Sequence, residues 1–373
     1  MSESEPTDLV IELDQRVLQV VTEAAASRRP PRATYRMQFH AGFTFRDATK
    51  LVPYLADLGI SHLYASPIFI ANPGSTHGYD VVDYNQINPE IGSREEFDDL
   101  VAALHERDMG LILDFVPNHM GIAAGLNEWW QDVLENGPSS PYAAWFDIDW
   151  QPLKPELDNK VLLPVLGDQY GVVLENGELE LRLTDGAFTV WYYSLPLPIA
   201  PPSYGMIMRA ALPALGDALP PEELITLEFE SLLAAFERLP GQTERDPDLI
   251  SERRRDQTVA KARLADLLDR SPEIRSAVEG AVRIFNGTPG DARSFDPLDA
   301  LLEAQSYRLA FWRVAAEEIN YRRFFAINEL AAIRQEDPSV FAATHQLLLE
   351  LIGNGSVDGV RIDHPDGLWD PAG

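Results

Sequence analysis

Apolar runs of strand length alternate with helix-period segments along the first third of the chain, and this alternation constrains the fold more than any other feature. The runs cover residues 34–39, 62–66 and 111–116, and the helix-period segments cover 45–58 and 95–107. Ser93 precedes Glu95 and Glu96 as a helix cap followed by an acidic first turn, while Gly59 and Gly110 follow the two helical segments. A strand, helix, strand order of this kind predicts parallel βα units and an α/β fold.

The next strand-like run lies much further along the chain, at 357–362, after a helical segment at 339–352. The distance along the chain from the third strand to this run is far longer than one βα repeat needs. The sequence therefore predicts a large α+β insertion after the third strand. We expect residues 33–120 to carry strands one to three, residues 121–300 to form the inserted lobe, and residues 301–373 to return to the fourth strand. Within the lobe, 121–218 predict a β-containing part, and 220–285 predict long surface helices, with the arginines at 253–255 on a solvated face.

Composition excludes several classes of protein. The 373 residues carry 30 Lys or Arg and 59 Asp or Glu, and the net charge of −29 would repel nucleic acid. The absence of cysteine excludes disulfide scaffolds and thiolate metal sites. Residues 1–32 predict a peripheral helix and a linker, the N-terminus is polar and acidic, and no apolar run has a membrane-spanning length, so we expect a cytoplasmic protein without membrane contacts.

Three short segments place polar side chains just beyond predicted strands. Parallel barrels take their catalytic groups from the carboxyl ends of the strands, so these segments are candidates for one site. Each has an ordinary alternative: a structural ion pair for the arginine and aspartate, a buried or loop position for the histidines, and core packing for the tyrosine. The joint occurrence of the segments favours a site over three separate structural explanations. The candidates are Asn118 and His119, Arg361 and Asp363, and His77 and Tyr79.

These residue types suit chemistry on sugars. Arg361 and Asp363 lie two residues apart on a strand and so point to the same side, and a carboxylate beside a guanidinium suits a nucleophile that must stay ionised. Retaining glycoside chemistry needs this carboxylate and a second, protonated one about 5–5.5 Å away. Tyr79 would stack against the reacting sugar, and Asn118 and His119 would hydrogen-bond its hydroxyls.

Residues 114–119 (DFVPNH) and 359–363 (GVRID), in this order, resemble two sequence regions of the α-amylase superfamily, glycoside hydrolase family 13. Within that superfamily the chain is similar to the maltooligosyltrehalose synthases from about residue 33 to its end. The segments that carry this resemblance are residues 34–45 (TYRMQFHAGFTF), 74–83 (GSTHGYDVVD), 132–138 (DVLENGP), 321–325 (YRRFF) and 361–368 (RIDHPDGL).

The resemblance implies a (β/α)8 TIM barrel, of which this chain holds the N-terminal half, about four strands. It implies that Asp363 is the nucleophile, that Arg361 orients it, and that His119 and Tyr79 contact the sugar that becomes covalently attached; we add His77 and Asn118 as substrate-binding residues. The implied enzyme is an isomerase of trehalose biosynthesis that needs no cofactor or metal. It converts the reducing-end α-1,4 bond of a maltooligosaccharide into an α,α-1,1 bond.

The general acid of the family, a glutamate after the fifth strand, has no counterpart in this chain, which ends ten residues after Asp363. We therefore expect an inactive N-terminal part of a longer enzyme. An α-glucan hydrolase of the same superfamily and a non-catalytic glucan-binding remnant remain open as alternatives. The sequence does not determine the oligomeric state.

Overall fold

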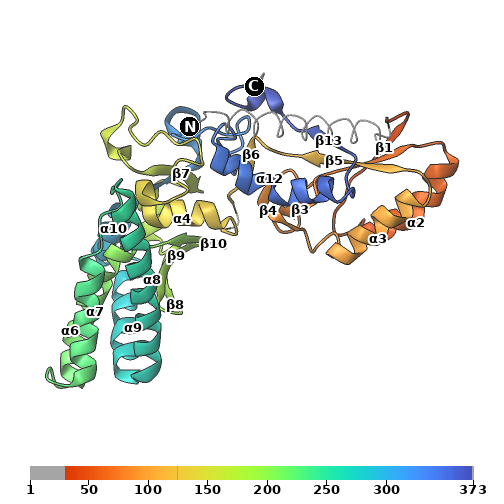
Figure 1. Cartoon of the computed structure of the whole chain (residues 1–373). Coiled ribbons are helices and arrows are strands. Elements are labelled where there is room, and N and C mark those ends of the chain that lie inside the picture. The colour runs from red at the N-terminus through yellow and green to blue at the C-terminus, as the bar shows by residue number, and fades with distance from the viewer. Residues whose placement is uncertain (1–29, 124, 372–373) are drawn as a thin grey trace, which may run out of the picture.

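A parallel sheet of four strands in the order β1-β2-β5-β13 forms the centre of one lobe of the chain (Figure 1). The computed structural model describes residues 30–371 apart from residue 124, so the predicted N-terminal helix lies outside the described residues. The prediction of an α/β fold is confirmed, and the strands nearly coincide with the four apolar runs of the sequence. They are β1 (Thr34–Met37), β2 (His62–Ala65), β5 (Gly110–Phe115) and β13 (Gly359–Ile362).

Helices α2 (Phe45–Asp57), α3 (Arg94–His105) and α12 (Pro338–Gly353) pack on this sheet. Their starts follow from local chemistry. The Ser93 side chain accepts a hydrogen bond from the backbone of Glu96, which completes a capping box. The Asp337 side chain caps α12, whose first residue is a proline.

The two faces of the sheet differ because side chains alternate along each strand. Leu63, Leu111 and Leu113 are buried in the core formed with the helices. Arg36 and Arg361 stand on the opposite face and remain exposed. This second face, which is polar near the carboxyl ends of the strands, carries the candidate site.

Two small antiparallel pairs extend the lobe beyond the strand ends. Strand β3 (Phe69–Ala71) pairs with β4 (Val81–Ile87), and the segment between them carries His77 and Tyr79. Strand β6 (His119–Gly121) pairs with β12 (Leu330–Ala332), which brings the returning chain beside His119.

Most residues between β5 and β13 form a second lobe, at the left of Figure 1, in which helices α6 to α9 pack side by side. Its strands are β7 (Val161–Leu166), which pairs in parallel with β11 (Tyr307–Phe311), and the meander β8 (Leu179–Thr184), β9 (Ala187–Tyr192) and β10 (Leu195–Pro198). The helices are α4 (Glu128–Asn136), α5 (Tyr170–Glu175), α6 (Tyr204–Ala218), α7 (Leu224–Glu237), α8 (Pro247–Arg270), α9 (Pro272–Phe285), α10 (Asp296–Glu303) and α11 (Ala315–Glu318).

One expectation about these helices is wrong. Arg253 does not lie on a solvated face: it is 1% exposed, its guanidinium contacts Asn136 Oδ1 at 3.3–3.4 Å and donates to the carbonyl of Pro240. Burial lowers its pKa to about 10. The reason is that α8 packs against α4, where Lys261 also pairs with Glu135. Arg254 and Arg255 are exposed as expected.

Candidate active site

A buried carboxylate, Asp114, organises the polar end of the sheet. Its side chain has no exposed surface. One oxygen accepts a hydrogen bond from Arg361 Nη1 at 2.9 Å, and the other accepts from the hydroxyls of Tyr64 at 2.8 Å and Tyr79 at 2.5 Å. Arg36 Nη2 lies 3.9 Å from the second oxygen. Asp114 thus accepts hydrogen bonds from three segments of the chain, and the positive charges of Arg361 and Arg36 lie beside it.

Arg361 links Asp114 to the predicted nucleophile. The pairing of β13 with β5 sets Arg361 opposite Asp114, and Arg361 Nη1 also donates to Asp363 Oδ1. Partial burial lowers the pKa of Arg361, but the hydrogen bonds to the two carboxylates outweigh this effect and raise the pKa above its ordinary value. The guanidinium therefore stays charged and holds both carboxylates.

Asp363 lies just beyond the end of β13, where its side chain is 14% exposed. Its backbone N–H donates to the carbonyl of Phe115 at 2.7 Å, which continues the pairing with the neighbouring strand by one residue. The next residue, His364, has a left-handed backbone with φ of 50°, so the chain turns sharply after Asp363. The carboxylate thus stands at the carboxyl edge of the sheet, between a guanidinium and solvent.

Tyr79 occupies the loop between β3 and β4. Its hydroxyl contacts Asp114 and accepts from Arg36 Nη2 at 2.8 Å, and burial together with the Asp114 bond raises its pKa. The loop depends on Gly78, which has φ of +76°; a Cβ there would lie 2.8 Å from the carbonyl oxygen of Pro67. A glycine is therefore needed to bring Tyr79 back over the sheet.

His119 is fully buried, and its ring packs 4.3 Å from that of Phe324, centroid to centroid. Burial lowers its pKa to about 4, so the imidazole is neutral at pH 7. Nε2 lies 3.1 Å from the backbone oxygen of Tyr79. Because that oxygen can only accept, Nε2 carries the ring hydrogen in this contact.

The two remaining predicted contacts differ in their surroundings. His77 is about half exposed, and its Nδ1 accepts from the backbone N–H of Tyr79 at 3.0 Å. Asn118 is 1% exposed, and its Oδ1 accepts from Arg322 Nη1 at 2.8 Å. Arg322 also donates to the carbonyl of Gly367 at 2.6 Å. Asn118, the segment that carries Arg322 and the C-terminal segment at Gly367 are thus connected through one guanidinium.

Sequence reasoning missed five residues that build this site. Asp114 opens the motif 114–119, and the strand alternation that sets Arg361 and Asp363 on one side gives Asp114 the same face of its own strand. Arg36 and Tyr64 share that face through the pairing of β1 with β2. Arg322 and Phe324 lie in the segment 321–325 that carries the family resemblance, but nothing in that segment shows that it returns from the insertion to meet Asn118 and His119. Among the described residues, no group of three or more acidic or histidine side chains is placed to hold a metal ion.

Part of the chain resembles a known family of catalytic domains. Residues 45–171 match the family model described as the α-amylase catalytic domain. Over 132 residues the chain is 40% identical to the intracellular maltogenic amylase of Bacillus subtilis (strain 168), a match that covers 35% of this chain and 21% of that protein. No helix of the described residues is long and apolar enough to cross a membrane.

Similarity to one group within this class extends over nearly the whole chain. A putative maltooligosyl trehalose synthase of Mycobacterium tuberculosis (strain ATCC 25618 / H37Rv) is 36% identical over 353 residues, which are 92% of this chain and 32% of that relative. The structure of maltooligosyltrehalose synthase from Arthrobacter ramosus is 34% identical with a TM-score of 0.60, covering 91% of this chain and 32% of that one. The resemblance to the maltooligosyltrehalose synthases of the α-amylase superfamily is thus confirmed, and the chain spans about a third of the length of these relatives.

Proposed function

We propose that this chain supplies the nucleophile-bearing part of a retaining enzyme that converts maltooligosaccharides to maltooligosyl trehaloses. The observation that carries the proposal is the contact of one guanidinium, Arg361, with both the buried Asp114 and the more accessible Asp363. It gives Asp363 a fixed position and a neighbouring positive charge, which a nucleophilic carboxylate needs. Support also comes from the similarity to synthases over 92% of the chain.

In the proposed reaction an oxygen of Asp363 attacks the anomeric carbon of the glucose next to the reducing end. The bond from that carbon to the glycosidic oxygen breaks, a general acid protonates the leaving reducing-end glucose, and a glucosyl ester forms on Asp363. The released glucose then turns over, and its own anomeric hydroxyl attacks the anomeric carbon held on Asp363 while the acid, now a base, takes the proton; the bond from that carbon to the Asp363 oxygen breaks. The new bond is α,α-1,1 and Asp363 is free again.

His77, Asn118 and neutral His119 are proposed to hold the hydroxyls of the sugar at Asp363, and Tyr79 to stack on its ring. His77 is exposed as it stands, whereas Asn118 and His119 are buried, so their contact with a sugar requires the covering side chains to move. Exclusion of water would decide rearrangement over hydrolysis. Arg361 is a positioning residue in this scheme. No cofactor takes part.

We propose that the general acid comes from outside the described residues. The carboxylates that contact Arg361 among those residues are Asp114 and Asp363, and both oxygens of the buried Asp114 already accept hydrogen bonds from Arg361, Tyr64 and Tyr79, so neither is free to meet a leaving sugar. We further propose that the four-stranded sheet is half of a (β/α)8 barrel, that the inserted lobe predicted for residues 121–300 also includes β11 and α11, and that the chain alone does not turn over glucans.

A substrate whose leaving group needs no acid tests this proposal on the chain as it stands. Fluoride departs unprotonated, so we expect 5-fluoro-α-D-glucosyl fluoride to add one glycosyl mass to the protein, and peptide mapping to place it on Asp363. The Asp363→Asn variant, matched in shape, is expected to take no label. Labelling of another residue, or an unlabelled wild-type chain that is folded, contradicts the proposal.

The linkage formed on transfer separates the alternatives. In the enzyme completed with its general acid, with α-glucosyl fluoride as donor and free glucose as acceptor, the proposal predicts an α,α-1,1 product, detected by NMR as a non-reducing disaccharide. Release of glucose as the main product would favour an α-glucan hydrolase. Binding of maltopentaose without labelling or transfer would favour a glucan-binding remnant.

A further inference from the structure

Arg322 joins the inserted lobe to the turn that carries the predicted nucleophile. It lies on the segment that returns from the lobe, and its side chain is partly buried. Nη1 donates to Asn118 Oδ1 at 2.8 Å and to the carbonyl of Gly367 at 2.6 Å, while Nε donates to Asp147 Oδ2 at 2.8 Å. One planar side chain thus meets the carboxyl end of β5, the chain after β13 and the inserted lobe.

Asp363 and Gly367 belong to one tight turn. The N–H of Asp363 donates to the carbonyl of Phe115 at 2.7 Å, and the N–H of Gly367 donates to the carbonyl of His364 at 3.1 Å. The chain between them bends through His364, whose φ of 50° is uncommon for a residue with a side chain. Because only a few residues separate Gly367 from Asp363, a displacement of Gly367 shifts the carboxylate of Asp363 as well.

The turn lies very close to the end of β5. A Cβ on Gly367 would lie 2.8 Å from Asn118 Oδ1 and would also overlap the ring of His364. That distance is shorter than van der Waals contact. A glycine at this position is therefore what lets the turn reach both Asn118 and Arg322.

Aromatic rings hold the same two segments together. Phe325, on the returning segment, has φ of 50°, as His364 has on the turn, and the centroids of their rings lie 5.4 Å apart. Phe324 packs edge to face on His364 at 4.9 Å. A left-handed backbone at a bulky residue persists only where the surrounding structure fixes it. The two segments thus fit each other through side chains as well as through the Arg322 hydrogen bonds.

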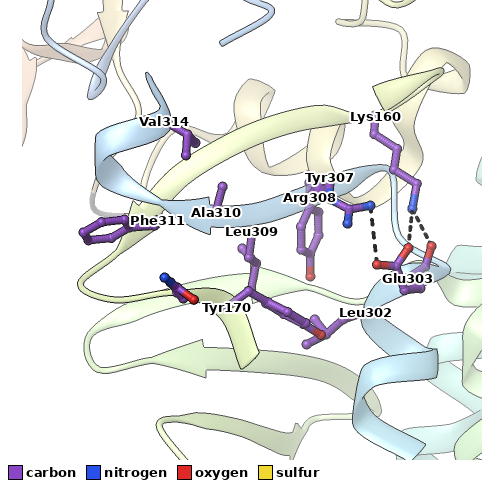
Figure 2. A pocket seen from close by; sticks show the side chains of 11 residues that line it. Lys160, Tyr170, Leu302, Glu303, Tyr307, Arg308, Leu309, Ala310, Phe311 and Val314 are labelled. Atoms are coloured by element: carbon purple, nitrogen blue, oxygen red, sulfur yellow. Dashed lines mark hydrogen bonds and ion pairs between the residues drawn. The ribbon is translucent and has the colours of Figure 1, made fainter. Parts of the chain in front are cut away.

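A second charged cluster of the inserted lobe does not reach the sheet. Figure 2 shows a cavity of about 240 Å³ with Lys160 and Arg308 at one end, where both pair with Glu303. These residues come from neighbouring elements of the lobe, so their contacts stabilise the lobe itself. Arg322 differs because two of its acceptors, Asn118 and Gly367, belong to the ends of the central sheet.

We propose that Arg322 is a positioning residue for the nucleophile, which holds the turn 363–367 against the end of β5 so that Asp363 stands where attack on an anomeric carbon requires it. The proposal rests on the proposed function, since it needs Asp363 to be the nucleophile. It assigns the returning segment of the inserted lobe a part in the chemical step. A displacement of about 1 Å can cost about a hundredfold in rate, so loss of the Arg322 contacts should slow attack more than it weakens sugar binding.

Labelling of the full chain by 5-fluoro-α-D-glucosyl fluoride measures the chemical step. An oxygen of Asp363 bonds to the anomeric carbon as fluoride leaves with the electron pair of the C–F bond, and mass spectrometry follows the added glycosyl mass with time. Arg322→Lys keeps the positive charge but lacks the planar fork that reaches these acceptors. We expect it to lower the labelling rate at saturating reagent about tenfold to a hundredfold, and to raise the reagent concentration at half-maximal rate less than about threefold.

Arg334→Lys is the matched control. Arg334 follows Arg322 on the returning segment and donates to the other oxygen of Asp147 at 3.2 Å, but the hydrogen bonds to Asn118 and Gly367 are those of Arg322. We expect this variant to be labelled at the parent rate. Gly367→Ala tests the contact from its other side and should slow labelling as Arg322→Lys does. Urea midpoints verify that each variant is folded.

Hydrogen exchange gives a readout that does not depend on the reaction. The peptide 359–368 should exchange its amide hydrogens faster in Arg322→Lys than in the parent chain, and at the parent rate in Arg334→Lys. Parent-like labelling of Arg322→Lys overturns the inference and leaves the proposed function standing, whether or not exchange changes. Slower labelling without faster exchange, or an equal loss of labelling in Arg334→Lys, also overturns it. A folded parent chain that takes no label overturns the proposed function, and the positioning role with it.

Discussion

Replacement of Asp114 by asparagine tests whether this carboxylate holds the site together. The substitution keeps the shape of the side chain but turns one oxygen into an NH2 group. That group would face donors, because Arg361 Nη1 points at one oxygen and the hydroxyls of Tyr64 and Tyr79 at the other. The negative charge opposite Arg361 is lost at the same time. We expect Asp114→Asn to destabilise the fold and to weaken glucan binding by releasing Tyr79.

The magnitude follows from the burial of the two partners. Removing one member of a buried ion pair costs about 3–5 kcal/mol, and a hydrogen bond to a charged group contributes about 1.5–3 kcal/mol. Asp114 has no exposed side-chain surface, but Arg361 is 46% exposed, so water can solvate the abandoned guanidinium in part. We therefore expect Asp114→Asn to lower the free energy of unfolding by about 2–4 kcal/mol, less than the loss of a fully buried ion pair and its hydrogen bonds together would cost.

Urea unfolding at pH 7, followed by tryptophan fluorescence, measures this loss as a shift of the midpoint at constant slope. Asp363→Asn is the matched control, since it removes the other carboxylate on the same guanidinium at the rim of the site. There we expect a smaller change, of about 1–2 kcal/mol, because Asp363 stands beside solvent and its guanidinium partner is 46% exposed. If Asp114→Asn costs no more than Asp363→Asn, the idea that Asp114 is the structural centre of the cluster is wrong.

Three further outcomes follow from the same site. Asp363→Asn should abolish glycosyl labelling while the Kd of maltopentaose, measured by calorimetry, stays within about threefold of the parent value, since the amide keeps the shape; a retained label would show that Asp363 is not the nucleophile. Gly78→Ala should lower the free energy of unfolding by at least about 1 kcal/mol, measured in urea, because its φ of +76° is unfavourable for a Cβ that would also meet Pro67; a neutral effect contradicts the stated role of that glycine. Burial lowers the pKa of His119 from 6.5 to about 4, so the unfolded chain binds an extra proton between these pH values. Stability should accordingly rise from pH 4 to pH 6.5, and His119→Phe should flatten the rise by up to about 3 kcal/mol; equal slopes in urea titrations of the two proteins would contradict the buried, neutral imidazole.

Much of the sheet and part of the site could be predicted from local sequence. The strands β1, β2, β5 and β13 lie where the apolar runs are, because burial under helices demands apolar residues at those positions. The alternation of side chains along a strand was enough to set Arg361 and Asp363 on one side. The helix caps at Ser93 and Asp337 are likewise local. The motifs 114–119 and 359–363 mark the carboxyl ends of β5 and β13, where Asp114, Arg361 and Asp363 lie together.

Tertiary structure alone decided the partners of these residues. Asp114 meets Tyr79 and Arg361 through contacts that span 35 and 247 positions of the chain, and Asn118 meets Arg322 across 204. Periodicity describes which side of an element is buried, and it carries no information on what a distant segment places there. Arg253 shows the same limit, since its charge suggested solvent while the packing of α8 on α4 buries it against Asn136. The sequence by itself determined the elements and the polar ends of the strands, and the long-range packing of the returning segment determined how those ends combine into a site.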